Sequence, residues 1–361
     1  MCRQSFTLHS ALYVYICFPM RKKPAADVKA GGTGAVCRAW QTKHGIPGLI
    51  QEMRKYNWLL GASGYVGNAV LRVLREKHPD RPVTALANKT MTYELTEHTN
   101  LLTGGLENFD FTWLDRFPPD TVYHCARIGG RTDLLRRRAG EAGRRANERW
   151  LEALAALPDP PRVVYCSGSL MYGNCASARE NNPMNPIAYG KEYIKAEIPW
   201  IEAKSVLPDV RMYRPGWIMG PDSWFLHFFW LPYLKSGQIP LYGNPGRKMS
   251  LIHLEDCAGL MVHAAEVGAP GKDFNPAPLK PITAKEFTET VAEQTGATVV
   301  RISAEETEKK YGKTVAEALC SDCALETDYP ETAAGYVPRY PSTELLIRKV
   351  LSDLRGLSKD E

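Results

Sequence analysis

The sequence has no hydrophobic run long enough to cross a membrane. Its most apolar stretch, residues 6–20, is followed at once by Arg21, Lys22 and Lys23. This stretch is shorter than the ~20 residues that a helix needs to span a bilayer. We therefore expect no membrane-spanning helix and no membrane partner.

An excess of one charge is also absent from most of the chain. The 361 residues contain 45 Lys and Arg against 40 Asp and Glu, a net charge of +5. Residues 1–52 contain seven basic and two acidic residues, which leaves 38 of each in the remainder. Nucleic-acid binding depends on a clustered excess of Lys and Arg. We therefore expect no nucleic-acid partner.

Cysteine is present, but without the pattern of a disulfide framework or a zinc site. The cysteines are odd in number, and several lie in apolar strand-like runs. Cys320 and Cys323 form a C-x-x-C pair that has no second pair or histidine pair at zinc-finger spacing. We expect reduced thiols in a cytoplasmic protein, and no metal site. The nine cysteines are at positions 2, 17, 37, 125, 166, 175, 257, 320 and 323.

The first 52 residues admit three interpretations. Arg3, the apolar stretch and Ala25–Ala26 weakly resemble a signal peptide, whereas the basic, acid-poor composition fits a transit peptide. We favour a third interpretation, in which Met53 is the natural start, because the first strand-like run begins three residues after it. Residues 1–52 are then an N-terminal extension that is disordered or non-native.

After Met53, short apolar runs alternate with longer amphipathic segments. This alternation is typical of β-α-β units that build a parallel sheet. Beyond Pro215 prolines and aromatic residues become frequent, and we expect a smaller subdomain there. The expected strands are residues 56–60, 83–87, 121–126, 163–167 and 210–214, and the expected helices are 68–77, 144–157, 255–266 and 284–295.

A glycine loop follows the first expected strand and opens a helix. Gly61 allows a sharp turn, Gly64 allows backbone N–H groups to approach a pyrophosphate, and Gly67 allows the helix to pack close to the strand. Tyr65 and Val66 lie at the helix N-terminus, where free amides and the helix dipole favour an anion. The loop predicts a dinucleotide cofactor, and an incidental glycine-rich turn is the alternative.

The end of the second expected strand lacks an acidic residue. A carboxylate that binds the ribose of NAD is expected there, but the sequence is Ala87-Asn88-Lys89. Without that carboxylate a 2′-phosphate is not repelled, and Lys89 could pair with it. We therefore favour NADP over NAD as the cofactor. The alternative is that Lys89 is only a solvated surface lysine.

A series of motifs follows in a defined order: Val122–Ala126, Asn147, Tyr165–Gly173, Glu180, Asn185–Gly190, Arg214–Gly216, Gly220–Pro221 and Ile252–Asp256. The order resembles the extended short-chain dehydrogenase/reductase family, the NAD(P)-dependent epimerase/dehydratase group, over about residues 56–300. The resemblance implies an α/β fold, with a Rossmann-type doubly wound parallel sheet and a smaller C-terminal substrate-binding subdomain.

The resemblance also divides the chain. Residues 53–215 would form the NAD(P)-binding Rossmann domain, and residues 216–361 mainly the substrate-binding subdomain, with segments that return to the sheet. Cys125, Ala126 and Pro215 join the expected cofactor site.

The family's chemistry requires a tyrosine acid/base, a serine or threonine that binds the substrate oxygen, and a lysine four residues after the tyrosine. The lysine's charge lowers the pKa of the tyrosine. The resemblance assigns the tyrosine to Tyr189 and the hydroxyl to Ser167 or Ser169. Counting back from Tyr172-Gly173, however, places Gly168 where the family usually has its hydroxyl.

The lysine position is also altered, because Tyr193 stands four residues after Tyr189. Lys191 and Lys195 point away from the tyrosine on a helix of 3.6 residues per turn. Pro199 is expected to kink this helix or end it early.

Other clusters have two interpretations each. Six arginines between Arg136 and Arg149 could bind an acidic ligand, but a solvated helix face is favoured. Aromatic residues between Trp217 and Trp230 could line a pocket or pack in the core. His124 and His253 are expected to be buried, hydrogen-bonded histidines.

The helices around Asn147 and Tyr189 resemble those that pair subunits in the family, which implies a homodimer.

These features predict an NAD(P)-dependent oxidoreductase, epimerase or dehydratase that acts on a hydroxyl or carbonyl carbon of a small molecule, either a sugar nucleotide or an apolar ketone or alcohol. Tyr189 is the expected proton donor or acceptor. The altered positions Gly168 and Tyr193 support an alternative, a non-catalytic relative that binds the dinucleotide as a structural or sensing ligand.

Overall fold

The computed structural model describes residues 56–89, 91 and 97–357. The apolar stretch, the three interpretations of residues 1–52 and the start at Met53 all lie outside these described residues. Within them, no helix combines the length and hydropathy that a bilayer crossing requires.

The central sheet has six strands in the order β3-β2-β1-β4-β5-β7. Every neighbouring pair is parallel. This is the order of a doubly wound dinucleotide-binding sheet, which reverses direction between β1 and β4. The predicted α/β Rossmann-type fold is therefore confirmed. The strands are β1 (Tyr56–Leu60), β2 (Val83–Ala87), β3 (Thr99–Thr103), β4 (Pro119–His124), β5 (Arg162–Cys166) and β7 (Val210–Tyr213).

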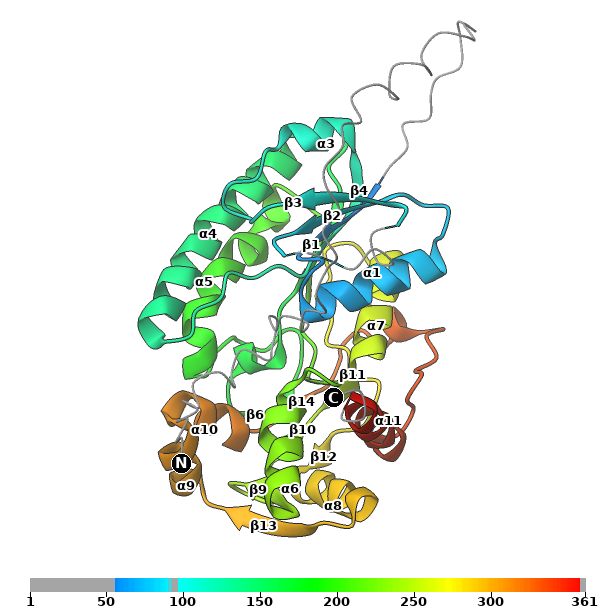
Figure 1. The fold of residues 1–361 in the computed structure, drawn as a ribbon. Helices are drawn as coiled ribbons and strands as arrows, with labels where there is room; N and C mark the ends of the chain where they lie inside the picture. The colour runs from blue at the N-terminus through cyan, green and yellow to red at the C-terminus, as the bar shows by residue number, and fades with distance from the viewer. Residues whose placement is uncertain (1–55, 90, 92–96, 358–361) are drawn as a thin grey trace, which may run out of the picture. The chain divides into compact units, whose positions relative to one another are not determined.

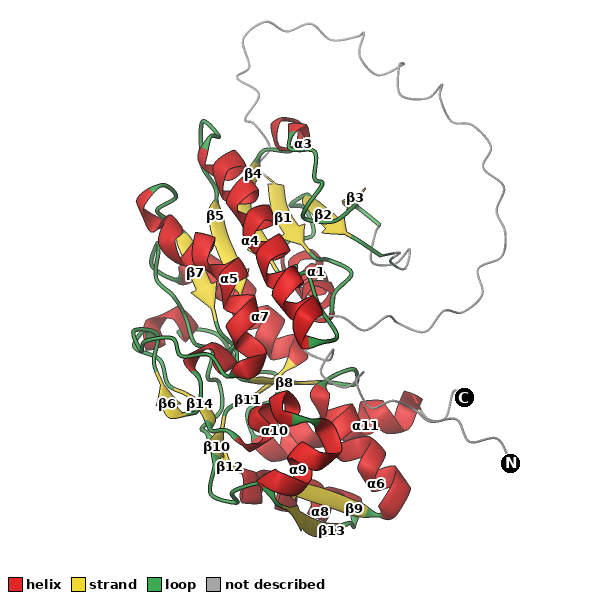
Figure 2. Cartoon of the chain, turned by 90° about the vertical axis from the view of Figure 1, so that its left-hand side faces the viewer, coloured by secondary structure: helices red, strands yellow, loops and turns green. Residues whose placement is uncertain are grey.

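Two pairs of helices lie along the central sheet (Figures 1 and 2). Each pair forms a separate hydrophobic cluster with the strands. α1 (Tyr65–Lys77) and α7 (Leu254–Val267) pack with Leu59 and Val164, and α4 (Asp133–Ala155) and α5 (Ala188–Glu202) pack with Trp58 and Val163. Successive strand residues face opposite sides, so both faces of the sheet are covered. The short helix α3 (Thr112–Arg116) precedes β4.

α4 and α5 approach each other closely because glycine faces the partner helix. A Cβ atom at position 140 would lie 2.0 Å from the Glu192 carbonyl oxygen, and one at position 143 would lie 2.8 Å from the Ala196 Cβ atom. Asn147 also joins the helices, since its Nδ2 donates to the Ala196 carbonyl at 2.7 Å. The two glycines therefore set the distance between the helices.

The remaining strands form smaller sheets. β6 (Cys175–Ala178), β10 (Lys248–Met249), β12 (Ile282–Thr283) and β14 (Cys323–Leu325) form one sheet. β8 (Trp217–Met219) pairs with β11 (Leu251–His253), and β9 (Gln238–Tyr242) pairs with β13 (Thr298–Ile302). The helices of this part are α6 (Leu231–Ser236), α8 (Ala284–Thr295), α9 (Ala304–Tyr311), α10 (Lys313–Cys320) and α11 (Thr343–Leu357).

The division of the chain at residue 215 stays a prediction, although segments cross it in both directions. β6 precedes residue 215 but joins the smaller sheet, whereas α7 follows it and packs with α1. Phe274 also bridges to Tyr213 of β7.

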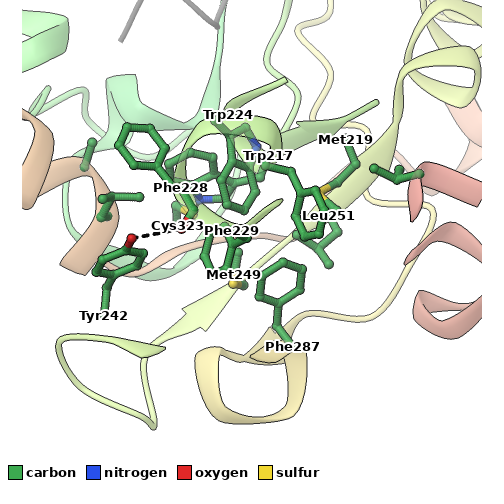
Figure 3. Close-up of a cluster of buried hydrophobic side chains, with 14 of the residues drawn as sticks. Trp217, Met219, Trp224, Phe228, Phe229, Tyr242, Met249, Leu251, Phe287 and Cys323 are labelled. Carbon is green, nitrogen blue, oxygen red and sulfur yellow. Dashed lines mark hydrogen bonds between the residues drawn. The ribbon is translucent and has the colours of Figure 1, made fainter. Parts of the chain in front are cut away.

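The aromatic residues after Trp217 form a core (Figure 3). The rings of Phe225 and Phe229 stack with centroids 5.6 Å apart, and Phe287 packs edge-on against Phe229 at 5.1 Å. Of the two interpretations of this cluster, core packing is therefore what the structure shows. The aromatic residues in question, Trp217, Trp224, Phe225, Phe228, Phe229 and Trp230, are all buried.

Pro199 does not end α5 early. The helix continues to Glu202, three residues beyond the proline. Trp200 is fully buried in the same cluster as Trp58. Tertiary packing can stabilise a final turn despite the hydrogen bond that proline removes, and the expectation of early termination was wrong.

We predict that Gly140→Ala destabilises the protein by about 2 kcal/mol, as overpacking does in close-packed interiors, because the added methyl group meets the Glu192 carbonyl oxygen. Gly356→Ala is the control, since Gly356 also lies in a helix and a Cβ atom there would meet nothing within 4 Å. That variant should be as stable as the parent or more stable. Chemical denaturation measures both, and equal effects would contradict the close contact.

Candidate active site

The glycine loop connects the carboxyl ends of three strands. The N–H groups of Gly61 and Ala62 donate to the Leu86 carbonyl of β2 at 2.9 and 3.0 Å. Gly61 has a φ of +86°, and a Cβ atom there would lie 2.7 Å from Ala126 Cα, just beyond β4. Glycine is therefore required both for the backbone conformation and for the close approach.

The same loop leads into the N-terminus of α1, where backbone N–H groups can bind an anion. A Cβ atom on Gly67 would lie 2.1 Å from the Gly61 carbonyl oxygen, so this glycine brings the helix against the strand. Gly64 occupies the N-cap without a side-chain cap. The amides of Tyr65, Val66 and Gly67 lie in the first turn, where N–H groups have no acceptor within the helix. These residues fit the pyrophosphate of a dinucleotide.

The other expected cofactor residues lie at neighbouring strand ends. Asn88 and Lys89 directly follow β2 and are exposed. Cys125 and Ala126 directly follow β4, and the Cys125 thiol is buried beside Met261, so only its backbone is available to a ligand. Pro215 is buried, and its carbonyl oxygen accepts from the Ser169 N–H at 2.9 Å.

Tyr189 is held by an arginine that the sequence analysis did not identify. Arg127 Nη2 donates to the Tyr189 hydroxyl oxygen at 2.8 Å. Arg127 lies in the loop between β4 and α4, far from Tyr189 in sequence. Its position directly after the Val122–Ala126 motif was the available signal, because the carboxyl ends of parallel strands meet at one edge of a sheet.

Tyr193 stands four residues after Tyr189 on α5, and it is buried. Its hydroxyl accepts from the Gly130 N–H at 3.1 Å, and its ring lies 4.1 Å from the Arg127 guanidinium carbon. Lys191 is exposed. Lys195 pairs with Glu141 at 3.0 Å and with Glu192 at 2.8 Å. Neither lysine therefore lies on the face of α5 that carries Tyr189, as helix periodicity predicts.

Two opposing effects act on the Tyr189 phenol. Burial raises its pKa above the ordinary value. The charge and hydrogen bond of Arg127, and the more distant charge of Arg136, act in the opposite direction. Burial disfavours the charged phenolate, whereas nearby cations favour it. The net direction is upward, so the phenol is protonated at neutral pH.

The two candidate serines have different surroundings. Ser167 Oγ donates to Glu197 Oε2 at 2.7 Å. Ser169 Oγ is buried and has no hydrogen-bond partner among the described residues. Gly168, between them, has an extended backbone with a φ of −173°, and a Cβ atom there would meet nothing within 4 Å. Buried hydroxyls normally have a partner, so Ser169 is the serine that could accept a ligand contact.

Glu197 is a second functional candidate that the sequence analysis missed. It is buried, and burial raises its pKa to about 7, against the opposing effects of Arg214, Ser167 and Arg127. It lies eight residues after Tyr189 on α5, about 80° around the helix from it, which is within the width of one helix face. That spacing was the signal available in the sequence.

Glu180 has a structural role. Its carboxylate accepts from the Asn275 N–H at 2.8 Å, the Thr327 hydroxyl at 2.6 Å and the Asp328 N–H at 2.7 Å. Asn275 in turn accepts from the Tyr172 hydroxyl at 2.9 Å. Glu180 thus ties the segments around Asn275 and Asp328 to the loop before α5.

The histidines are buried, as expected. His124 Nε2 bonds to Asn147 Oδ1 at 2.9 Å, and burial lowers the pKa of His124 to about 4. His253 Nδ1 accepts from the Glu255 N–H and caps α7. In each histidine, one ring nitrogen has a hydrogen-bond partner. The other, Nδ1 of His124 and Nε2 of His253, is buried without a partner among the described residues. The expectation of fully hydrogen-bonded histidines is therefore met at one nitrogen of each ring only.

The arginine cluster is mainly a solvated helix face. Arg136 is the exception, because it is buried and pairs with Asp133. The exposed members are Arg137, Arg138, Arg144, Arg145 and Arg149.

No group of three or more His, Cys, Asp or Glu side chains in the described ranges is arranged to hold a metal ion.

Several solved structures share this fold. UDP-glucuronic acid 4-epimerase from Bacillus cereus in complex with NAD has a TM-score of 0.68 at 16% identity, covering 85% of this chain and 98% of its own. dTDP-glucose 4,6-dehydratase from Bacillus anthracis in complex with NAD has a TM-score of 0.66 at 14% identity, covering 84% of this chain and 98% of its own. At such identities the likeness establishes the fold alone.

The family is established by sequence. No curated protein matches the chain. Residues 58–277, more than half of the chain, match the NAD dependent epimerase/dehydratase family. This range includes the glycine loop, Tyr189 and both candidate serines, and the family's description implies a cofactor of the NAD(P) type. The chain therefore belongs to the NAD dependent epimerase/dehydratase family.

Proposed function

We propose that the protein is an NAD(P)-dependent enzyme, an epimerase, dehydratase or reductase, that acts on a hydroxyl or carbonyl carbon of a small molecule with Tyr189 as the acid/base. The observation that carries the proposal is the Tyr189 hydroxyl, buried and bonded to Arg127 at 2.8 Å. Arg127, Ser167 and Gly61 all follow the carboxyl ends of sheet strands. In such sheets ligands bind at that edge.

A sugar nucleotide is the substrate class that we propose. The solved structures of similar fold are described as enzymes of UDP-glucuronic acid and dTDP-glucose. The second substrate class, an apolar ketone or alcohol, rested on aromatic residues such as Trp224 and Phe228, which pack in a core. Their burial removes the observation that favoured it.

In the proposed chemistry, the nicotinamide of the bound cofactor supplies or accepts hydride. Tyr189 moves a proton between its Oη atom and the substrate oxygen. Ser169 donates a hydrogen bond to that oxygen, since its hydroxyl is without a partner in the described part of the chain. Ser167 is the alternative donor, although its hydroxyl is bonded to Glu197.

We propose NADP as the preferred cofactor. Asn88 and Lys89 are exposed directly after β2, where NAD-binding members of this fold place a carboxylate. Lys89 would pair with the 2′-phosphate of NADP, whereas Asn88 repels neither cofactor. The solved structures of similar fold are described as NAD complexes, so this preference would distinguish the chain from them.

We also propose that the protein is a cytoplasmic homodimer that pairs through α4 and α5. Leu134 and Leu135 on α4 are 59% and 44% exposed, and apolar side chains exposed on a helix favour burial in an interface. The free cysteines support a reducing compartment.

A second function, a non-catalytic dinucleotide sensor, is favoured by a specific observation. Gly168 provides no hydroxyl at the family's position, and Tyr193 provides no cation. A protein of this kind would bind the cofactor without turnover.

We predict that Tyr189→Phe lowers turnover about 100-fold or more, the usual contribution of a general acid. Cofactor affinity should be unchanged, because the glycine loop is intact. Tyr233→Phe is the matched control, since its hydroxyl bonds to Thr295 in the smaller part of the protein. Steady-state kinetics on a panel of sugar nucleotides and calorimetry with NADP measure the two quantities. Full turnover in Tyr189→Phe would remove its assigned role.

We predict that Lys89→Glu weakens NADP binding about tenfold, the equivalent of ~1.4 kcal/mol, because a carboxylate would face the 2′-phosphate. NAD affinity should change little. Lys280→Glu has the same charge change at another exposed position and serves as the control. Calorimetric titration of both cofactors decides the matter, and an equal loss for NADP and NAD would reject the pairing.

We predict that Gly168→Ser is tolerated by the fold, because the added side chain enters open space from an extended backbone. If the protein is an enzyme, the restored hydroxyl should raise turnover several-fold, since one hydrogen bond contributes about 1 kcal/mol. Gly105→Ser, also in open space, controls for the substitution itself. Turnover that stays at zero in parent and variant alike would support the sensor.

A further inference from the structure

Arg127 Nη2 donates a hydrogen bond to the Tyr189 hydroxyl oxygen at 2.8 Å. The bond joins two distant parts of the chain, the loop after β4 and the first turn of α5. Arginine remains charged at all accessible pH values and donates from a rigid planar group. A fixed cation therefore faces the phenol oxygen.

The guanidinium group is held in place by aromatic rings. Its carbon lies 4.1 Å from the Tyr193 ring centroid and 5.6 Å from the Tyr189 ring centroid. The two rings pack edge to face with centroids 5.3 Å apart. Cations are attracted to aromatic faces, so Tyr193 positions the arginine.

The Arg127 loop is also tied to α5 through its backbone. The Gly130 N–H donates to the Tyr193 hydroxyl oxygen at 3.1 Å, and that hydroxyl donates to the Gly130 carbonyl oxygen at 3.4 Å. A lysine at position 193 could make neither the ring contact nor the hydrogen bond that Tyr193 accepts. Tyr193 and Arg127 therefore belong to one arrangement.

Within the described ranges, the groups that act electrostatically on the Tyr189 phenol include Arg127 from the loop after β4, Tyr193 from α5 and Arg136 from α4. Arg136 is 6.0 Å from the Tyr189 ring centroid and is paired with Asp133. Arg127 donates a hydrogen bond to the phenol oxygen.

We propose that Arg127 is the positioning residue that replaces the family's lysine, stabilising the Tyr189 phenolate and fixing the direction of its proton transfer. The proposal rests on the proposed function of Tyr189 as the acid/base. When Tyr189 acts as the acid, its Oη–H bond breaks, the proton bonds to the substrate oxygen, and the electron pair stays on Oη facing the guanidinium. The reverse transfer restores the phenol.

The test measures the Tyr189 phenol directly in the full chain. A fluorinated tyrosine is installed at position 189, and its fluorine NMR shift is followed against pH in the parent and in Arg127→Met, Arg127→Gln and Arg127→Lys. An opposite charge at this distance shifts a pKa by about 1–3 units. Loss of the charge should therefore raise the pKa of the phenol by at least about one unit in Met and Gln variants, and Lys should restore most of the shift.

Arg138→Met is the matched control, because Arg138 is an exposed arginine of α4, and it should leave the titration unchanged. The pH profile of kcat should move to higher pH in Arg127→Met and return in Arg127→Lys, with KM little altered. A structural role alone would not move the profile or be rescued by lysine.

An unchanged or lowered phenol pKa in folded Arg127→Gln would overturn the inference. The Gln variant keeps a donor without the charge, so it decides the matter even if Arg127→Met does not fold. If the titration moves as expected but neither parent nor variants turn over any sugar nucleotide, the proposed function fails and the electrostatic coupling of Arg127 to Tyr189 stands.

Discussion

The contact between Gly61 and Ala126 is the constraint on which the site depends. A Cβ atom on Gly61 would lie 2.7 Å from Ala126 Cα, so the chain leaving β1 and the chain leaving β4 meet without room for a side chain. The sheet order reverses at this point, and sheets of this type bind a dinucleotide at such a reversal. The same contact fixes the backbone just before Arg127, and so fixes where that side chain can reach.

The surroundings of Tyr189 follow from this placement of Arg127. A buried phenol would otherwise resist ionisation, because desolvation disfavours the phenolate. Close packing of α4 against α5 through Gly140 and Gly143 brings the loop before α4 near the first turn of α5. The glycines thus act on the chemistry indirectly, by setting the distance across which Arg127 donates its hydrogen bond.

The sequence predicted best those elements that are buried on both sides or well capped. β1, β2 and α8 have the expected bounds, because a continuous apolar run or a capping box marks each one. β3 was missed, since its residues are mostly half-exposed. α4 begins at Asp133, eleven residues before the expected start, because its arginine-rich first turns have little apolar periodicity and are held by packing against α5.

The candidate site was predictable where it depends on local backbone and not where it depends on contacts between distant elements. The glycine loop is local, so Gly61 and Gly67 could be assigned from spacing alone. Helix periodicity relates Tyr189 only to lysines of its own helix, such as Lys191 and Lys195. A cation can reach the phenol from any element that ends at the same edge of the sheet, and Arg127 does so from the neighbouring strand. The loss of a motif residue therefore does not imply the loss of the charge that it provides.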